Sequence, residues 1–416
     1  MTVPARRAGS DFVAPVRQEN VRAHNLGLIL QQIVAVGATA ISRVELARAT
    51  GLARPTVSRL VDDLLAGGLI VEVGPNRSRS TGRPPVGLAL SRTGPAGLGL
   101  DIRTGSLTAC IVDFAGTVRH LEFAPRTHPV TAPERTIDDL AAIAKQAIRT
   151  AASQGLTIAG VTLAAPGPVQ DRSMVRFAPS IGWRDFDAGV RLRAALGSDE
   201  LAVSVDNEAG LAALAEWHAS ERELRNFVCV FGDFELGAGI FLHGELVRGA
   251  RGWSGELGHV TVDADGVSCA CGAKGCLQGY AGLAAILAAV PDAERRAGAT
   301  SHQTPAVTIE GLAGRSPQVR AALARAGTAL GVSLATLINL IDVDTVLLDG
   351  SYSLLAAWLT DEIQTQIRER VLTAGWAPVE VRAAPIGPDA AVIGAALTAV
   401  HDVRRDPSTW LARTRR

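Results

Sequence analysis

Long apolar runs are missing from this sequence. Candidates such as residues 281–290 fall far short of the ~20 residues that a helix needs to cross a bilayer. Residues 1–20 also lack the apolar stretch of a secretory signal peptide. We therefore expect a soluble, cytoplasmic protein that has no membrane partner and keeps its cysteines in a reducing compartment.

Lysine is nearly absent: Lys145 and Lys274 are the only two, so arginine carries almost all of the positive charge. The 416-residue chain has no net charge, but the charge is spread unevenly. Residues 1–95 hold 12 Arg and 6 acidic residues, whereas the remainder holds 29 basic and 35 acidic residues. A basic end on an acidic body predicts that only the N-terminal end meets a polyanion such as nucleic acid.

Cysteine is scarce as well, yet three of the five cysteines fall within eight residues, at Cys269, Cys271 and Cys276. His259 lies ten residues before the first of them. One His and three Cys complete a tetrahedral zinc site and leave no open position for catalysis. Buried thiols or a disulfide are the alternative, although Cys-x-Cys is too short for comfortable disulfide geometry. We predict one structural zinc ion (Zn) per chain.

Three short helices are predicted near the N-terminus. The first covers residues 21–36, with apolar side chains at helical spacing from Leu26 to Val34, and ends at Gly37. Ser42 and Glu45 form a capping box that opens a second helix. A third helix follows, with Pro55 in its first turn and Ala53 as a weak cap. Short helix, glycine turn and second helix is the order of a helix-turn-helix.

Two short strand patterns then flank a basic loop at residues 74–85, which is typical of a wing. Polar and basic side chains on the third helix and in the wing are the types that contact phosphates and base edges. The predicted DNA-binding residues are Arg54, Thr56, Ser58, Arg59, Arg77, Arg79 and Arg83. A small helical bundle with a charged face is the alternative, but the wing and the charge asymmetry favour binding to DNA.

From residue 96 onward, short apolar strands alternate with helical patterns, as in an α/β protein. About 320 residues exceed one typical domain, so two lobes are expected. Cys110 and Cys229 lie in apolar runs and are predicted core residues. Residues 403–416 are interpreted as a loosely ordered end without an assigned function.

Several stretches of this second region, taken in order, resemble the ROK family of repressors and sugar kinases. They are LDIRTGS, AAPGPV, PSIGW, VDNEAGLAALAE, LGAGIFLHGELVRGARGWSGELGHV, CACGAKGCLQ and IGAAL. The resemblance spans residues 20–400 and implies an actin-like, sugar-kinase-like ATPase fold whose two lobes enclose a cleft for sugar and nucleotide. ROK repressors carry a winged domain and ROK kinases lack it. The chain therefore resembles the repressor branch, of the xylose-repressor or N-acetylglucosamine-repressor type.

The resemblance also shows where a kinase mechanism would fail. The family's first phosphate loop, D-I-G-G-T, reads DIRTG at residues 101–105, so side chains would fill the space of a phosphate. The second loop, T-G-x-G-x-G in the family, is preceded here by Asp233 and Glu235, which would repel an anionic nucleotide. Glu208 replaces the catalytic Asp, and a displacement of ~1 Å can cost ~100-fold in rate. We predict that the protein is not an enzyme.

A polar sugar pocket is the other implication of the resemblance. Its residues would be Ser180, Asn207, Glu208, Glu256, His259 and Gln278. Three of them depart from the family's pattern, since the family has Asp at 208, Glu at 278 and Asn at 180. We predict a sugar or sugar-derivative effector with an altered preference; loss of effector binding is the alternative. His259 would ligate zinc and orient a hydroxyl or Glu256, or ligate zinc only.

The expected organisation is an α/β chain with a flexible arm (1–19), a winged helix-turn-helix domain (20–92) and a two-lobed effector-binding and oligomerisation domain (93–416) with its zinc site at 259–276. We predict a DNA-binding transcriptional repressor of carbohydrate-related genes. As a homodimer or homotetramer it would bind an inverted-repeat operator in double-stranded DNA. A ROK sugar kinase with an appended DNA-binding domain, or an effector-independent DNA-binding dimer, remains as an alternative.

Overall fold

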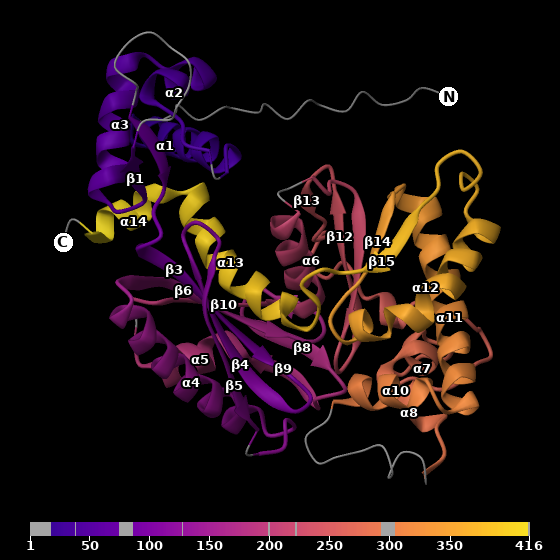
Figure 1. Ribbon diagram of the computed structural model, residues 1–416. Helices are drawn as coiled ribbons and strands as arrows, with labels where there is room; N and C mark the ends of the chain where they lie inside the picture. The colour runs from indigo at the N-terminus through magenta and orange to yellow at the C-terminus, as the bar shows by residue number, and fades with distance from the viewer. Residues whose placement is uncertain are drawn as a thin grey trace, which may run out of the picture. The chain divides into compact units, whose positions relative to one another are not determined.

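The computed structural model describes residues 18–37, 39–74, 86–126, 128–198, 200–220, 223–292 and 304–414 (Figure 1). The chain forms two compact units. One comprises Met1–Leu90 with Asp402–Arg416, and the other comprises Ser91–His401. The division after Leu90 falls close to the boundary at residue 92 that the sequence suggests.

The first unit is a winged helix-turn-helix, as predicted. Its N-terminal elements are α1 (Gln18–Ala35), α2 (Arg43–Thr50), α3 (Arg54–Ala66) and the antiparallel pair β1 (Ile70–Val73) and β2 (Gly87–Leu90). The capping box between Ser42 and Glu45 is present, and Gly51 ends α2 with a φ of 71°. Ala53 gives α3 no side-chain cap. The apolar spacing of α3 becomes its buried face, made by Val57, Leu60, Val61 and Leu64.

The C-terminal end of the chain differs from the prediction. The sequence was expected to form one domain over 93–416, with 403–416 as a loosely ordered end without an assigned function. Residues 407–414 form the helix α14 (Pro407–Thr414), which belongs to the winged unit. Trp410 is only 5% exposed, and its indole Nε1–H donates to the carbonyl of Gly67 at 2.9 Å. Leu411 is buried against the same turn. This helix therefore completes the core of the winged unit.

Replacing Trp410 with alanine is expected to destabilise the winged unit by ~3–5 kcal/mol, because it removes a buried aromatic side chain and leaves the Gly67 carbonyl without its donor. Thermal unfolding followed by circular dichroism should show an earlier first transition. Trp376→Ala is a matched control, since Trp376 is 82% exposed and should change little. Equal shifts for the two variants would contradict this role of α14.

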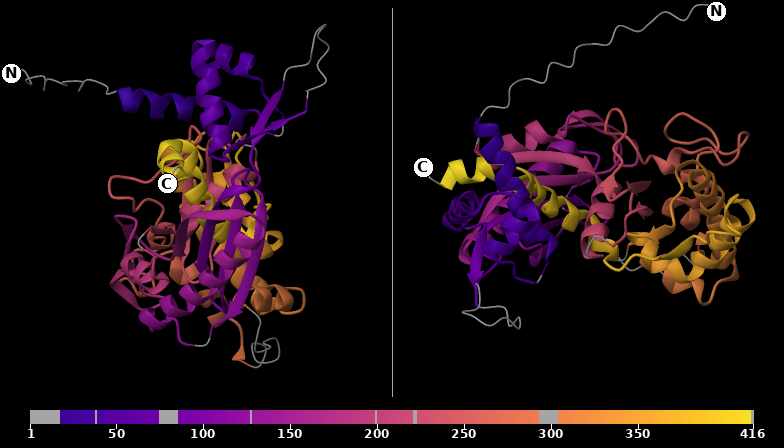
Figure 2. Two further views of the ribbon diagram at one scale, coloured as in Figure 1. Left: turned by 90° about the vertical axis from the view of Figure 1, so that its left-hand side faces the viewer. Right: turned by 90° about the horizontal axis from the view of Figure 1, so that it is seen from above.

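The second unit contains two five-stranded sheets of similar topology, one in each lobe (Figures 1 and 2). In each sheet an antiparallel meander is extended by parallel strands. The first lobe has β3 (Gly94–Ile102), β4 (Ser106–Asp113), β5 (Val118–Pro125), β6 (Leu156–Ala165) and β10 (Ala202–Asn207). The second lobe has β11 (Phe227–Gly232), β12 (Leu236–Leu242), β13 (Glu245–Leu246), β14 (Thr345–Leu348) and β15 (Glu380–Ala383).

Helices cover these sheets, which is why the central strands read as continuous apolar runs. A small third sheet, β7 (Val169–Gln170), β8 (Met174–Ala178) and β9 (Trp183–Asp187), belongs to the first lobe, with α4 (Pro133–Ser153) and α5 (Ala188–Leu196). The second lobe adds η1 (Leu257–His259), α7 (Gln278–Ala281), α8 (Leu283–Ala288), α10 (Pro305–Ala313), α11 (Pro317–Ile341) and α12 (Ser351–Arg370). The elements shared by the two lobes are α6 (Glu208–Ala219), η2 (Gly387–Asp389) and α13 (Ala390–Arg405).

Glycines allow α13 to pack closely between β3 and α6. A Cβ atom on Gly99 would lie 2.0 Å from the carbonyl oxygen of Val392, and one on Gly394 would lie 1.8 Å from that of Leu211. Both approaches are to backbone, so no side-chain movement could relieve them. A larger residue at Gly99 would force α13 away from the first sheet, and one at Gly394 would force it away from α6.

One helix, α11, is long and apolar enough to cross a membrane by length and composition alone. More than half of its most apolar window is buried, and the helix packs against α12 in the core of the second lobe. This is the environment of a core helix.

Candidate functional site

The exposed side of α3 carries the predicted DNA contacts. Arg54 and Arg59 are exposed, and Thr56 and Ser58, on either side of buried Val57, are half-buried. Among the described residues neither arginine has a hydrogen-bond or ion-pair partner, so both guanidinium groups can contact another molecule. The wing residues Arg77, Arg79 and Arg83 lie outside the described residues.

Acidic side chains on α3 are neutralised within the unit. Asp62 pairs with Arg43 at 2.8 Å, and Asp63 pairs with Arg22. Arg43 also pairs with Glu72 of β1 at 2.9 Å. Since these carboxylates already have cationic partners, α3 presents free arginines at its start and no unpaired acid.

The predicted metal ligands converge. The ligand atoms of His259, Cys269, Cys271 and Cys276 all lie within 4.8 Å of one another. The Sγ atoms of Cys271 and Cys276 are 3.7 Å apart, and Cys269 Sγ is 3.8 Å from His259 Nδ1. A tetrahedral ion with bonds of ~2.3 Å to sulfur places its ligands ~3.7 Å apart. All five cysteines are free, so this cluster can hold a metal ion and contains no disulfide.

The loop at residues 259–276, which holds the predicted metal ligands, is linked by hydrogen bonds to the cleft between the lobes. Thr261 pairs with Cys276 in an isolated β-bridge, and the next residue, Leu277, donates its N–H to Val260. Gln278 then accepts a hydrogen bond from the backbone N–H of Leu236 at 2.8 Å. A metal ion at this cluster would therefore fix both the 256–259 segment and the β11–β12 turn.

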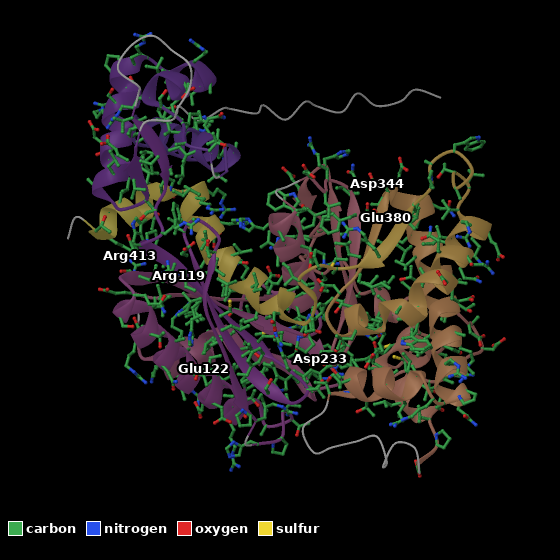
Figure 3. The ribbon with its side chains drawn as sticks, in the orientation of Figure 1. Arg119, Glu122, Asp233, Asp344, Glu380 and Arg413 are labelled. Atoms are coloured by element: carbon green, nitrogen blue, oxygen red, sulfur yellow. The ribbon has the colours of Figure 1, made fainter. Side chains whose placement is uncertain are left out.

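The two predicted phosphate loops are bonded to each other across the cleft. Asp233, in the β11–β12 turn, accepts hydrogen bonds from both the backbone N–H and the hydroxyl of Thr104, each at 2.7 Å. Figure 3 shows Asp233 where the lobes meet. Arg103 pairs with Asp101 at 2.9 Å and with Asp389 at 2.9 Å. The side chains of Arg103 and Thr104 therefore fill the space in which a kinase of this family binds phosphate groups.

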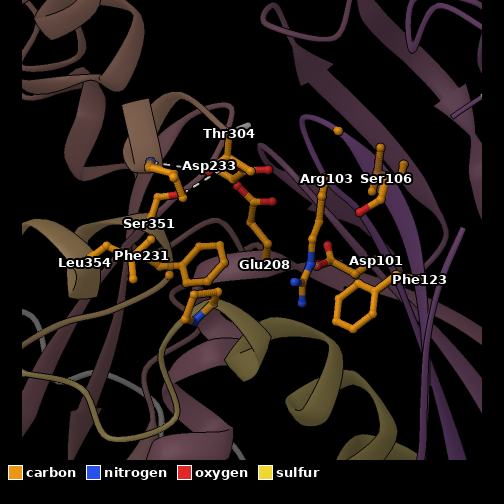
Figure 4. Close-up of a pocket in the computed structure, with 15 residues that line it drawn as sticks. Asp101, Arg103, Ser106, Phe123, Glu208, Phe231, Asp233, Thr304, Ser351 and Leu354 are labelled. Carbon is orange, nitrogen blue, oxygen red and sulfur yellow. Dashed lines mark hydrogen bonds and ion pairs between the residues drawn. The ribbon is translucent and has the colours of Figure 1, made fainter. Parts of the chain in front are cut away.

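A cavity of about 280 Å³ lies beside these loops (Figure 4). Its polar residues include Asp101, Arg103, Glu208 and Asp233, and Figure 4 shows Glu208 between Asp233 and the Arg103–Asp101 pair. Its apolar lining is Ile102, Phe123, Phe231, Val307, Leu354 and Pro388. Three of the four charged residues described in its wall are therefore acidic.

The sequence profile of the ROK family matches residues 97–402, about three quarters of the chain. The chain belongs to the ROK family. A profile of bacterial regulatory proteins of the crp family matches residues 40–70, which contain α2 and α3. The expected winged domain followed by a ROK domain is therefore confirmed.

Repressors and kinases both appear among the relatives. The chain is 26% identical to the xylose repressor of Bacillus subtilis over 388 residues, covering 91% of this chain and 95% of that one. It is 30% identical to a glucokinase of Streptomyces coelicolor, covering 74% of this chain and 98% of the glucokinase. The crystal structure of a ROK family transcriptional regulator, a homologue of the E. coli MLC protein, matches with 25% identity and a TM-score of 0.75, covering 94% of this chain and 99% of that one.

Three of the predicted effector residues already have partners in this ROK cleft. Asn207 caps α6 and donates to the Gly167 carbonyl at 3.0 Å. Ser180 donates to Glu235 at 2.6 Å through its hydroxyl, and Gln278 holds the 234–236 turn. The side-chain carboxylates of Glu208 and Glu256, in contrast, have no hydrogen-bond partner among the described residues. His259 belongs to the metal cluster.

Two features of the cleft were not predicted from the sequence. One is the Arg103–Asp389 ion pair, and the other is the closed Thr104–Asp233 contact. The Asp–x–Arg spacing could have suggested the Asp101–Arg103 pair, but nothing local points to residue 389. The partner is 286 positions away and belongs to η2, just before α13.

Replacing Glu208 with glutamine is expected to stabilise the protein at pH 8 and to have little effect at pH 5. Burial, together with nearby carboxylates led by Asp101 and Asp233, raises the pKa of Glu208 well above 4.5. An acid whose pKa is raised by folding costs stability as pH rises above its unfolded value. Melting temperatures at the two pH values test this. We expect a gain of at least ~2 °C at pH 8, and an equal gain at pH 5 would contradict it.

Proposed function

We propose that this protein is a DNA-binding transcriptional repressor whose operator affinity responds to a sugar or sugar derivative. The observation that carries the proposal is that similarity to a xylose repressor runs through the winged unit as well as the ROK domain, whereas similarity to a glucokinase covers only 74% of the chain. Helix α3 would enter the major groove, and Arg54 and Arg59 would contact phosphates or guanines. A two-fold operator requires two copies of the chain, so we propose a homodimer or a pair of dimers.

The proposal assigns no catalytic role to the cleft. Arg103 is held between two carboxylates, and Thr104 and Asp233 bond to each other where a kinase needs backbone N–H groups for phosphate. Glu208, Asp233 and Glu235 would add repulsion against a nucleotide. The metal cluster would hold zinc, whose preferred ligands are imidazole and thiolate, and the ion would brace Glu256 in the effector pocket.

Fluorescence anisotropy with promoter fragments of the genes that flank this coding sequence tests the function. We expect nanomolar binding to one fragment, a steep loss of affinity with salt, and a change of ~5–150-fold on adding one sugar of a panel that includes xylose and glucose. Absence of binding to every fragment at low salt would overturn the proposal. Operator binding that ignores all sugars would favour the effector-independent dimer.

The kinase remains a second candidate because of the 30% identity to a glucokinase. A coupled assay of ATP consumption with xylose, glucose and N-acetylmannosamine separates the two. We expect a rate no higher than that of the buffer, and turnover near ~1–100 s⁻¹ would establish a kinase.

A further inference from the structure

The cavity in Figure 4 has two chemically different sides. One is apolar and includes Phe231 and Leu354, which lie together in Figure 4. The other brings Asp101, Glu208 and Asp233 together. A volume of about 280 Å³ is just below the usual range of ~300–1,000 Å³ for small-molecule sites, so the ligand must be small. The combination predicts a ligand that has an apolar body and one strongly polar group.

The charge of the polar side is negative. Arg103 is the only basic residue among those that line the cavity. Its guanidinium pairs with Asp101 and also with Asp389, so its single positive charge is shared by two carboxylates. Asp233 receives neutral hydrogen bonds from Thr104 and from the Ser351 hydroxyl but no cation among the described residues. An anionic ligand would therefore be repelled from this side.

Glu208 is a buried acid of the cavity wall whose carboxylate has no partner in the described part of the chain. Its side chain is 4% exposed, lies in the cavity wall, and has no hydrogen bond or ion pair among the described residues. Burying a carboxylate in this way costs free energy unless a cation or a donor meets it. A bound molecule with a cationic or hydrogen-bond-donating group could therefore supply the partner that Glu208 lacks.

We infer that this cavity binds a small organic amine, with its ammonium group between Glu208 and Asp233 and its apolar body against Phe231, Val307 and Leu354. An ammonium group has three donors, enough for both carboxylates and one more acceptor, and aromatic rings attract it as well. A hydrated divalent cation suits the site less, because Mg²⁺ keeps most of its water and gains nothing from an apolar wall. The raised pKa of Glu208 would fall when the ammonium binds.

Calorimetry on the full-length protein at pH 7 tests this inference with matched pairs: 2-phenylethylamine against 2-phenylethanol, and cyclohexylamine against cyclohexanol. We expect at least one amine to bind at least 10-fold more tightly than its alcohol. Glu208→Gln should weaken that binding at least 10-fold, and Leu354→Trp, which fills the cavity without changing its charge, should abolish it. Glu369→Gln removes an exposed carboxylate from α12 and should bind normally.

Equal affinity for amine and alcohol, absence of binding by both amines, or normal binding by Glu208→Gln would overturn the inference. Displacement of the amine by millimolar MgCl₂, but not by NaCl at equal ionic strength, would assign the site to a metal ion instead. Circular dichroism establishes that each variant is folded. None of these outcomes bears on operator binding, which is measured separately.

Discussion

Removal of both α3 arginines, in the double variant Arg54→Ala/Arg59→Ala, is expected to weaken operator binding by ~100-fold or more. Both guanidinium groups are exposed and without partners among the described residues, so each is available to DNA. A lost guanine contact costs ~1–3 kcal/mol, and a lost phosphate contact also lowers the dependence of affinity on salt. The apolar face of α3 is untouched, so the stability of the winged unit should not change.

Anisotropy titrations at several salt concentrations separate the two kinds of contact. If one of these arginines contacts a base, replacing it alone with alanine should reduce the difference in affinity between operator and scrambled DNA. If it contacts phosphate, both affinities should fall together and the salt slope should decrease by ~1. The double variant Arg149→Ala/Arg325→Ala removes two exposed arginines of the second unit as a matched control. Wild-type affinity in the α3 variant would remove these residues from the interface.

Loss of the predicted zinc site is expected to have a large effect on the response to effector. Cys271→Ser, or a strong chelator, should release about one zinc ion per chain and unfold the loop between His259 and Cys276. Structural zinc contributes ~10–16 kcal/mol to the folding of small zinc domains. Here the loop is attached to a large core, so we expect local unfolding and not collapse of the lobe. Because Gln278 links this loop to the β11–β12 turn, the sugar response should be lost while operator binding persists.

Metal analysis, limited proteolysis and anisotropy with effector measure these three consequences. Ser268→Ala is a suitable control, since it changes the same loop but no predicted ligand. Full zinc content in Cys271→Ser would show that this thiolate is not required for the metal. If the protease also cleaves Ser268→Ala rapidly, the unfolding results from the change in the loop sequence and not from loss of the metal ion.

The sequence determined those features whose physics is local. The capping box of α2 and the buried face of α3 depend on residues less than ten positions apart, and the predicted metal ligands all lie between residues 259 and 276. The two-lobed fold was predicted from the order of motifs that resemble the ROK family, and the match to the family's sequence profile confirmed it.

Only the tertiary structure decided which distant side chains meet. Trp410 and Gly67 are 343 positions apart, and Thr104 and Asp233 are 129 apart. No periodicity records such pairs, because topology and close packing bring them together. The same holds for Glu208: the sequence marks it as an altered catalytic acid, whereas the fold buries it beside other acids without a cation. Its chemistry is set by desolvation and neighbouring charge, which exist only once the two lobes are folded.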